Sequence, residues 1–173
     1  SSPLSFRRRR QVCIRDGLAS RLLESGAIEY GDFLLASGAR SSYYIDIKAA
    51  TTNPAILAEI GKAIAEGREF EVVAGVAVGG VPIAVAVSLA SGRPYAIVRK
   101  EAKDHGKSGS IIGEVNGKDV LLVEDVTTSG GSAIYGIEAL RAAGAHVDRV
   151  VTVVDREAGA REALAEKGVS LQA

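Results

Sequence analysis

The sequence has few of the residues that build disulfide frameworks, metal sites and membrane spans. Its 173 residues include one cysteine, Cys13, and two histidines, so an internal disulfide is excluded and a zinc site is not expected. It has no apolar run of about 18 residues, the length that spans a membrane. Residues 1–10 are polar and basic and do not resemble a secretory signal. We therefore expect a cytoplasmic protein that does not cross a membrane.

An excess of charge of one sign is also missing. Lys and Arg together number 21, as do Asp and Glu, and the formal net charge is zero. Proteins that grip nucleic acid or anionic membranes carry a sustained basic excess, so we expect neither partner. The one conspicuous charge run, Arg7–Arg10, is interpreted as an anion-binding arm or as a solvated leader, and we favour the leader. Residues 1–10 are accordingly assigned to a disordered leader or to residues added for expression, and residues 11–173 to a single domain.

Short apolar runs alternate with helical patterns through most of the chain. The sequence predicts a hairpin over 30–46 that turns at Ser37-Gly38, helices over 11–25, 54–66, 82–90, 132–143 and 160–167, and buried strands over 72–76, 95–98, 120–123 and 150–154. Strands that are apolar on both faces and separated by helices indicate a parallel sheet. The predicted fold class is therefore α/β, a parallel sheet flanked by helices, with a small N-terminal cap or hood. Ligands bind beyond the carboxyl ends of such strands, which places the expected site in the loops 77–81, 99–114, 124–132 and 155–159.

The segment that follows the strand over 120–123 has the composition of a sugar-phosphate site. Glu124 and Asp125 come first, and a loop rich in hydroxyls and glycine then leads to a helix, through Val126, Thr127, Thr128, Ser129, Gly130, Gly131 and Ser132. Backbone N–H groups and hydroxyls at a helix N-terminus suit one phosphate, and two neighbouring acids suit the hydroxyls of a sugar. A P-loop and a Rossmann fingerprint fit less well, because no lysine precedes Ser132 and the two glycines are adjacent. The plainer alternative is an ordinary turn with an N-cap at Ser132.

This segment resembles the phosphoribosyl-diphosphate motif of the type I phosphoribosyltransferases. Three further segments resemble the members of that family that act on orotate. The charged loop that begins Arg-Lys-Glu-Ala-Lys-Asp-His-Gly at Arg99 is similar to their catalytic lid, and Ser37–Asp46 is similar to their N-terminal substrate segment. Val153–Glu157 is similar to the strand end that places an arginine beside the orotate carboxylate. The resemblance covers roughly residues 29–157.

The resemblance implies a Mg²⁺-dependent transfer of the phosphoribosyl group from phosphoribosyl diphosphate to orotate. It implies a homodimer in which the lid, residues 99–113, reaches into the site of the neighbouring subunit. The catalytic residues that it implies are Arg99, Lys100, Lys103, His105 and Asp125, with His105 either an acid or a ligand. Lys103 and its basic neighbours would meet the charge that grows on the leaving diphosphate.

The same resemblance implies which residues bind each part of the substrates. Glu124 and Asp125 would hold the ribose hydroxyls and are the candidates to meet Mg²⁺. The 5′-phosphate would lie in the segment Thr127–Ser132, and the diphosphate beside Gly79 and Gly80. The remaining candidates are Tyr44, Lys48 and Val126, together with Thr128 and Arg156, which would orient orotate.

Some alternatives stay open at this point. Ala36 and Gly79 stand where relatives commonly carry lysine, and Lys48 is the candidate replacement. Gly79-Gly80 is also compatible with an ordinary turn, and Arg156 with a surface ion pair to Asp155 or Glu157. A purine phosphoribosyltransferase would share the phosphate motif but would not need this lid or Arg156. A non-catalytic phosphoribosyl-diphosphate sensor would want a nucleic-acid-binding surface, which neutral charge disfavours.

Overall fold

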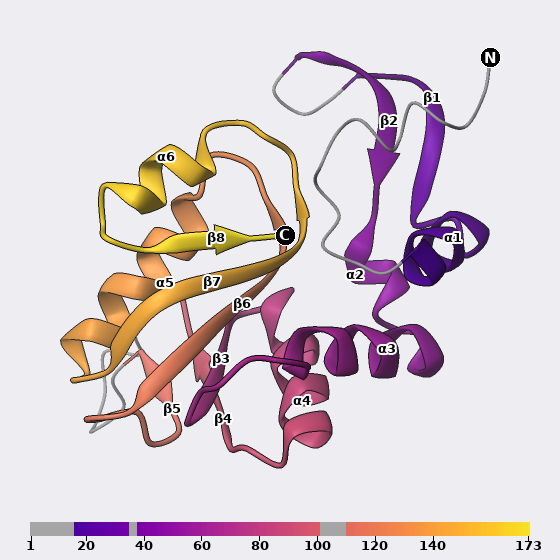
Figure 1. Ribbon diagram of the computed structural model, residues 1–173. Coiled ribbons are helices and arrows are strands. Elements are labelled where there is room, and N and C mark those ends of the chain that lie inside the picture. Colours follow the sequence, from indigo (N-terminus) through magenta and orange to yellow (C-terminus); the bar gives the residue numbers. More distant parts are fainter. Residues whose placement is uncertain (1–15, 35–37, 101–109) are drawn as a thin grey trace.

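The computed structural model describes residues 16–34, 38–100 and 110–173 (Figure 1). Along these residues the elements are α1 (Asp16–Glu24), β1 (Ile28–Leu34), β2 (Arg40–Ile45), α2 (Ile47–Ala50), α3 (Pro54–Ala65), β3 (Val72–Val76), α4 (Gly80–Ser91), β4 (Tyr95–Val98), β5 (Ile111–Ile112), β6 (Asp119–Thr127), α5 (Gly131–Ala142), β7 (His146–Asp155), α6 (Ala160–Ala165) and β8 (Ser170–Gln172). None of the helices in these ranges is long and apolar enough to cross a lipid bilayer.

The first four elements, α1 to α2, form the hood, residues 16–50. Strands β1 and β2 pair antiparallel, with Ile28 opposite Ile45, which confirms the predicted hairpin. Its predicted turn lies partly outside the described residues, as does the start of the first predicted helix. Helix α2 was not predicted, because four residues are too few to leave a periodic pattern. The Asp46 carboxylate caps it by accepting a hydrogen bond from the Ala49 N–H at 3.0 Å.

The central sheet has the strand order β5-β4-β3-β6-β7-β8. All neighbours from β4 to β8 pair parallel, as predicted, and β5 alone is antiparallel, against β4. The prediction of an unbroken loop over 99–114 is therefore wrong at β5. Strands β5 and β8 were not predicted, because they contain only two and three residues. The mixed sheet remains the parallel, helix-flanked type that the sequence indicates.

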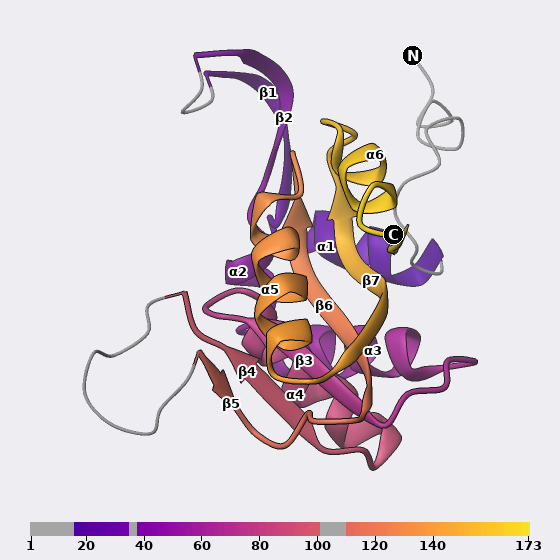
Figure 2. The same cartoon turned by 90° about the vertical axis from the view of Figure 1, so that its left-hand side faces the viewer.

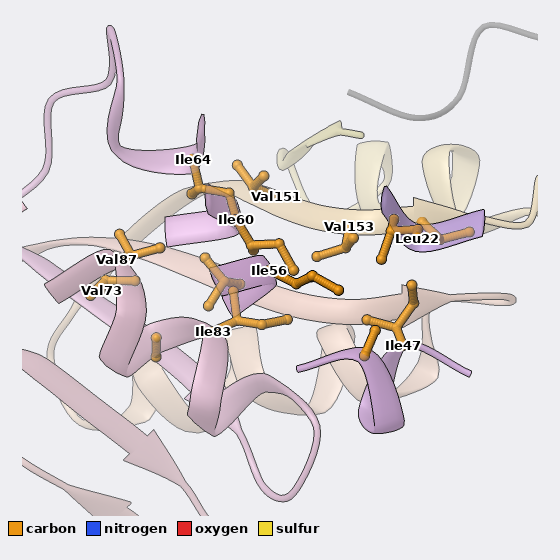
Figure 3. Packing of buried hydrophobic residues seen from close by; sticks show 14 of the residues in the cluster. Leu22, Ile47, Ile56, Ile60, Ile64, Val73, Ile83, Val87, Val151 and Val153 are labelled. Atoms are coloured by element: carbon orange, nitrogen blue, oxygen red, sulfur yellow. The ribbon is translucent and has the colours of Figure 1, made fainter. Parts of the chain in front are cut away.

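Two layers of helices cover this sheet, because successive side chains of a strand point to opposite faces. Val73 and Val151 pack toward α3 and α4 (Figure 3), whereas Leu122 packs toward α5 and α6. The hood joins the first of these layers through Leu22 and Ile47, which belong to the same cluster as the side chains of α3 and α4. Figure 2 shows α5 lying across the sheet on the face opposite α3 and α4.

The order of the strands places a topological switch point between β3 and β6. After β3 the chain moves to β4 on one side, and it later returns to β6 on the other side. In such sheets the diverging connections open a crevice at the carboxyl ends of the strands. Strand β6 extends to Thr127, past the predicted end at Val123, because its pairing with β7 continues to Thr127 opposite Asp155. Glu124 and Asp125 therefore lie inside this strand, at its carboxyl end.

Candidate active site

Glu124 and Asp125 are the centre of the candidate site. As neighbours on a strand they point to opposite faces of the sheet, and they are 3% and 5% exposed. The Ser132 hydroxyl donates to Glu124 Oε1 at 3.2 Å from the first turn of α5. On the other face, Lys48 Nζ donates to Asp125 Oδ2 at 2.8 Å from α2 of the hood. Each face of the sheet thus contributes one polar side chain to the acid pair, Ser132 on one face and Lys48 on the other.

The two acids have different electrostatic environments. Burial and, to a smaller extent, the negative charge of Asp125 raise the pKa of Glu124 to about 7, against opposing effects of the Ser132 hydroxyl, Lys100 and Lys48. Asp125 has a cation in direct contact, and its hydrogen bond raises the pKa of Lys48. The site therefore combines an ion pair with an acid that is ready to hold a proton at neutral pH.

The phosphate loop, Thr127–Ser132, turns directly into α5. Gly130 has a φ of 88°, the left-handed conformation that glycine adopts readily, and it is the N-cap residue. The alternative of a Ser132 N-cap is therefore wrong, because Ser132 lies inside the helix and its hydroxyl binds Glu124. Thr128, Ser129 and Gly131 are exposed at this end. The first N–H groups of any helix lack intrahelical partners, so this loop can receive an anion.

The glycine loop, residues 77–80, lies directly against Asp125. A Cβ added to Gly79 would lie 2.2 Å from Asp125 Oδ2, and one added to Gly80 would lie 2.8 Å from the carbonyl oxygen of Val123. The bond between Ala77 and Val78 is a cis peptide. A side chain at position 79 would displace the Asp125 carboxylate, so an ordinary turn does not account for this glycine pair. Gly79 carries no charge of its own, and the cation that contacts the Asp125 carboxylate is Lys48 of the hood.

Arg156 follows the end of β7 and faces the hood. Its guanidinium carbon lies 5.1 Å from the centre of the Tyr43 ring. The Asp155 carboxylate is engaged elsewhere, by the Glu157 N–H at 2.9 Å and by Arg161 Nε at 3.2 Å. Within the described part of the chain Arg156 forms no ion pair with Asp155 or Glu157, which removes the surface ion-pair alternative.

Tyr43 was missed by the sequence prediction, which selected its neighbour Tyr44. Because β2 alternates its faces, Tyr44 points away from Arg156 and packs against Phe33, with ring centres 5.7 Å apart. The structure therefore places Tyr43 beside Arg156, and Tyr44 on the other face of the hairpin stays a predicted substrate-binding residue. The two-residue period of the strand was a usable signal, but the sequence did not say which face meets the sheet.

The described residues include the two ends of the predicted lid, which we call its base. Lys103 and His105 lie outside the described residues, whereas Arg99 and Lys100 follow the carboxyl end of β4. The Arg99 N–H donates to the Ser110 carbonyl at 2.7 Å, which joins the two ends of the loop. The Tyr135 hydroxyl of α5 lies 3.0 and 3.1 Å from the carbonyl oxygens of Arg99 and Lys100. Tyr135 is a second residue that sequence reasoning missed; its only signal was an aromatic ring on the exposed face of α5.

The described residues contain no group of three or more His, Cys, Asp or Glu side chains that could hold a metal by themselves. Either carboxylate, that of Glu124 or that of Asp125, can nevertheless supply a ligand to Mg²⁺, which commonly takes one or two carboxylates together with substrate phosphates and water. The donor set thus suits a metal that arrives with a phosphorylated ligand.

The chain is similar to known proteins in both sequence and fold. The family model for the phosphoribosyl transferase domain matches residues 46–171. The orotate phosphoribosyltransferase of Methanoculleus marisnigri is 85% identical over 90% of this chain and 92% of its own length. The solved orotate phosphoribosyltransferase of Mycobacterium tuberculosis, in complex with Fe(III) dicitrate, superposes with a TM-score of 0.79 at 37% identity, covering 90% of this chain and 91% of its own. The same enzyme in complex with 5-phospho-α-D-ribosyl 1-diphosphate superposes with a TM-score of 0.66 at 37% identity, covering 74% and 77%.

Proposed function

This chain belongs to the phosphoribosyl transferase family, and we infer that within the family it is an orotate phosphoribosyltransferase. It transfers the 5-phosphoribosyl group of phosphoribosyl diphosphate to orotate, giving orotidine 5′-phosphate and diphosphate, a step of pyrimidine biosynthesis. The observation that carries this assignment is the buried acid pair at the switch point, between the phosphate loop and Gly79, in a chain so similar to enzymes of that name.

We propose the following places for the substrates. The 5′-phosphate lies in the phosphate loop, against the first turn of α5, and the diphosphate lies beside Gly79 and Gly80. The ribose hydroxyls bind the carboxylates at the carboxyl end of β6, and Lys48 leaves Asp125 to meet the incoming anion. Arg156 meets the orotate carboxylate, since its planar fork can bind a carboxylate through two N–H groups. The complex of the solved Mycobacterium tuberculosis relative with 5-phospho-α-D-ribosyl 1-diphosphate supports this compound as the ligand.

The chemistry that this site must support is mainly electrostatic. The bond between the anomeric carbon and the diphosphate oxygen breaks, and a bond from that carbon to a ring nitrogen of orotate forms. Positive charge develops on the ribose and negative charge on the leaving diphosphate, so fixed charges held in position lower the barrier. Asp125 lies on the ribose side of this charge separation. Lys48, Lys100 and the lid residues Lys103 and His105 supply positive charge on the diphosphate side.

The proposal includes a divalent cation and a second subunit. Mg²⁺, when held by the substrate and by Glu124 or Asp125, would neutralise part of the diphosphate charge. A homodimer is supported by α4, which has no charged residue and yet exposes Leu89 to 82%, and the proposal includes a lid shared across its subunits. A cytoplasmic location, in keeping with the single cysteine, completes the proposal.

The activity is tested by following the loss of orotate absorbance with the chain, phosphoribosyl diphosphate and Mg²⁺, leaving out one component at a time. Adenine, hypoxanthine and uracil are run in parallel as alternative acceptors. We expect orotate to be consumed only when all components are present, and the other bases to remain. Turnover of a purine without turnover of orotate would overturn the assignment, and turnover of no base would favour a sensor of phosphoribosyl diphosphate.

A further inference from the structure

The contact between Arg156 and Tyr43 joins two parts of the molecule that are far apart in the sequence. Arg156 follows β7 of the central sheet, and Tyr43 belongs to β2 of the hood. Their separation of 5.1 Å from guanidinium carbon to ring centre is within the range of a cation–π interaction. A cation of the sheet is thus held against an aromatic ring that the hood supplies.

Arg156 needs such a contact, because the acids nearest in the sequence do not orient its side chain. Asp155 is engaged by Arg161 and by the backbone of Glu157, as described above. The backbone of Arg156 is fixed, since its N–H donates to the Thr127 carbonyl at 2.9 Å. The side chain beyond the backbone is long and has many rotamers. Among the described residues, the Tyr43 ring is the one charged or aromatic group that contacts its guanidinium.

Tyr43 is itself held in position by its own strand. The Ser41 hydroxyl donates to the Tyr43 carbonyl at 2.7 Å and accepts from the Tyr43 N–H at 3.3 Å. Its partner across the hairpin is Tyr30. These contacts fix the backbone at Tyr43, so the ring presents a stable surface to Arg156.

An aromatic face suits this task better than a carboxylate would. A carboxylate would occupy the N–H donors of the guanidinium, which lie in its plane, and would cancel its charge. A ring attracts the cation through its face and takes none of those donors. Arg156 can therefore be oriented and still offer its N–H groups to another planar anion.

We propose that Tyr43 is a positioning residue that orients Arg156 for the carboxylate of the acceptor base, so that the hood takes part in selecting the base. This inference rests on the proposed function. It assigns to Tyr43 no contact with the reacting atoms. Removing the ring should weaken the binding of orotate and leave the ribose and diphosphate interactions as they are.

The test compares Tyr43→Leu and Tyr43→Gln, which remove the ring, with Tyr43→Phe, which keeps the ring and loses the hydroxyl. We expect KM for orotate to rise about fivefold in the first two, the effect of losing one partly buried cation–π contact. KM for phosphoribosyl diphosphate and kcat should stay within about twofold, and Tyr43→Phe should match the parent chain. Tyr95→Leu, at the start of β4, is the matched control for removing an exposed tyrosine.

The inference fails if both ring-removing variants keep the parent KM for orotate, or if KM for both substrates rises equally, as a general loosening of the hood would cause. It also fails if Tyr43→Phe is as impaired as Tyr43→Leu. In an Arg156→Gln background the loss of the ring should have no further effect on KM for orotate. A parent chain that does not consume orotate would instead contradict the proposed function, and binding of orotidine 5′-phosphate to the same variants would then decide the role of Tyr43.

Discussion

Glu124 is an acid in surroundings that favour its neutral form. Its partner Ser132 is uncharged, whereas Asp125 beside it is paired with Lys48. Burial is the main reason that its pKa rises from 4.5 to about 7. Lys48 of the hood therefore forms an ion pair with only one of the two carboxylates, and we expect the other to become fully ionised when further positive charge reaches the site.

The raised pKa of Glu124 predicts a stability that falls as the pH rises. Between about pH 4.5 and about pH 7 the folded chain keeps a proton that the unfolded chain has lost, so the free energy of unfolding decreases through this window. The full effect is on the order of 3 kcal/mol. Glu124→Gln should match the parent chain at about pH 4 and exceed its stability at pH 8, in urea unfolding without Mg²⁺ or substrate. Parallel pH profiles of the two chains would refute the assignment of this proton to Glu124.

Lys103 is expected to act on the transition state. Lys103→Ala should lower kcat on the order of 10²-fold, the typical loss for one preorganised donor to developing charge. KM for orotate should change little, since that base binds on the other side of the ribose. Lys118→Ala, an exposed lysine just before β6, is the control. A Lys103→Ala enzyme with near-parental kcat would remove the lid from the mechanism.

At the scale of elements, the connection from β3 to α4 depends on glycines for two different reasons. Gly75 and Gly80 let two backbone segments approach, because a Cβ on Gly75 would lie 2.2 Å from the Gly80 carbonyl oxygen. Gly79 instead leaves room for a functional side chain, the Asp125 carboxylate. The first contact supports the fold, and the second supports the site.

This difference predicts separate effects for two similar variants. Gly79→Ala should displace the Asp125 carboxylate and lower kcat/KM on the order of 10²-fold, with a small change in the free energy of unfolding. Gly75→Ala should destabilise the chain by about 2 kcal/mol, because backbone atoms must move apart. Enzyme kinetics and urea unfolding of both variants separate the two roles. Equal loss of stability in the two variants would contradict these separate roles.

The sequence predicted the elements that have strong periodic patterns and missed those defined by contacts. The buried strands and their helices follow from apolar periodicity, and the phosphate loop follows from its hydroxyls and glycines. Strand β8 is too short to leave such a pattern, and the end of β6 depends on its pairing with β7. Tyr43 and Tyr135 became site residues only through partners distant in the sequence, Arg156 and the base of the lid. No local pattern carries that information.

At the scale of the whole molecule, α4 carries no charged residue and is almost entirely apolar. Its inner face packs against the sheet through Ile83 and Val87, and Leu89 is exposed on the outside. A helix that is apolar all round is normally buried, which indicates a second copy of the chain on this surface. Val78 of the glycine loop is also exposed and would extend the apolar surface toward the site.

We expect the parent chain to sediment as a dimer and Leu89→Glu to sediment as a monomer, because the substitution places a charge inside an apolar interface. Ala142→Glu, on the exposed side of α5, is the matched control and should remain dimeric. If the lid is shared, the monomeric variant should also lose most of its activity. A monomeric parent chain would contradict the dimer and the shared lid together.

The central claim is that catalysis occurs at the acid pair on the switch point between β3 and β6. The most direct measurement is the rate of orotate consumption by Asp125→Asn, compared with Asp119→Asn at the other end of the same strand. The account predicts a fall on the order of 10²-fold for Asp125→Asn and a near-parental rate for Asp119→Asn. An Asp125→Asn enzyme as fast as the parent chain would contradict this placement of the active site.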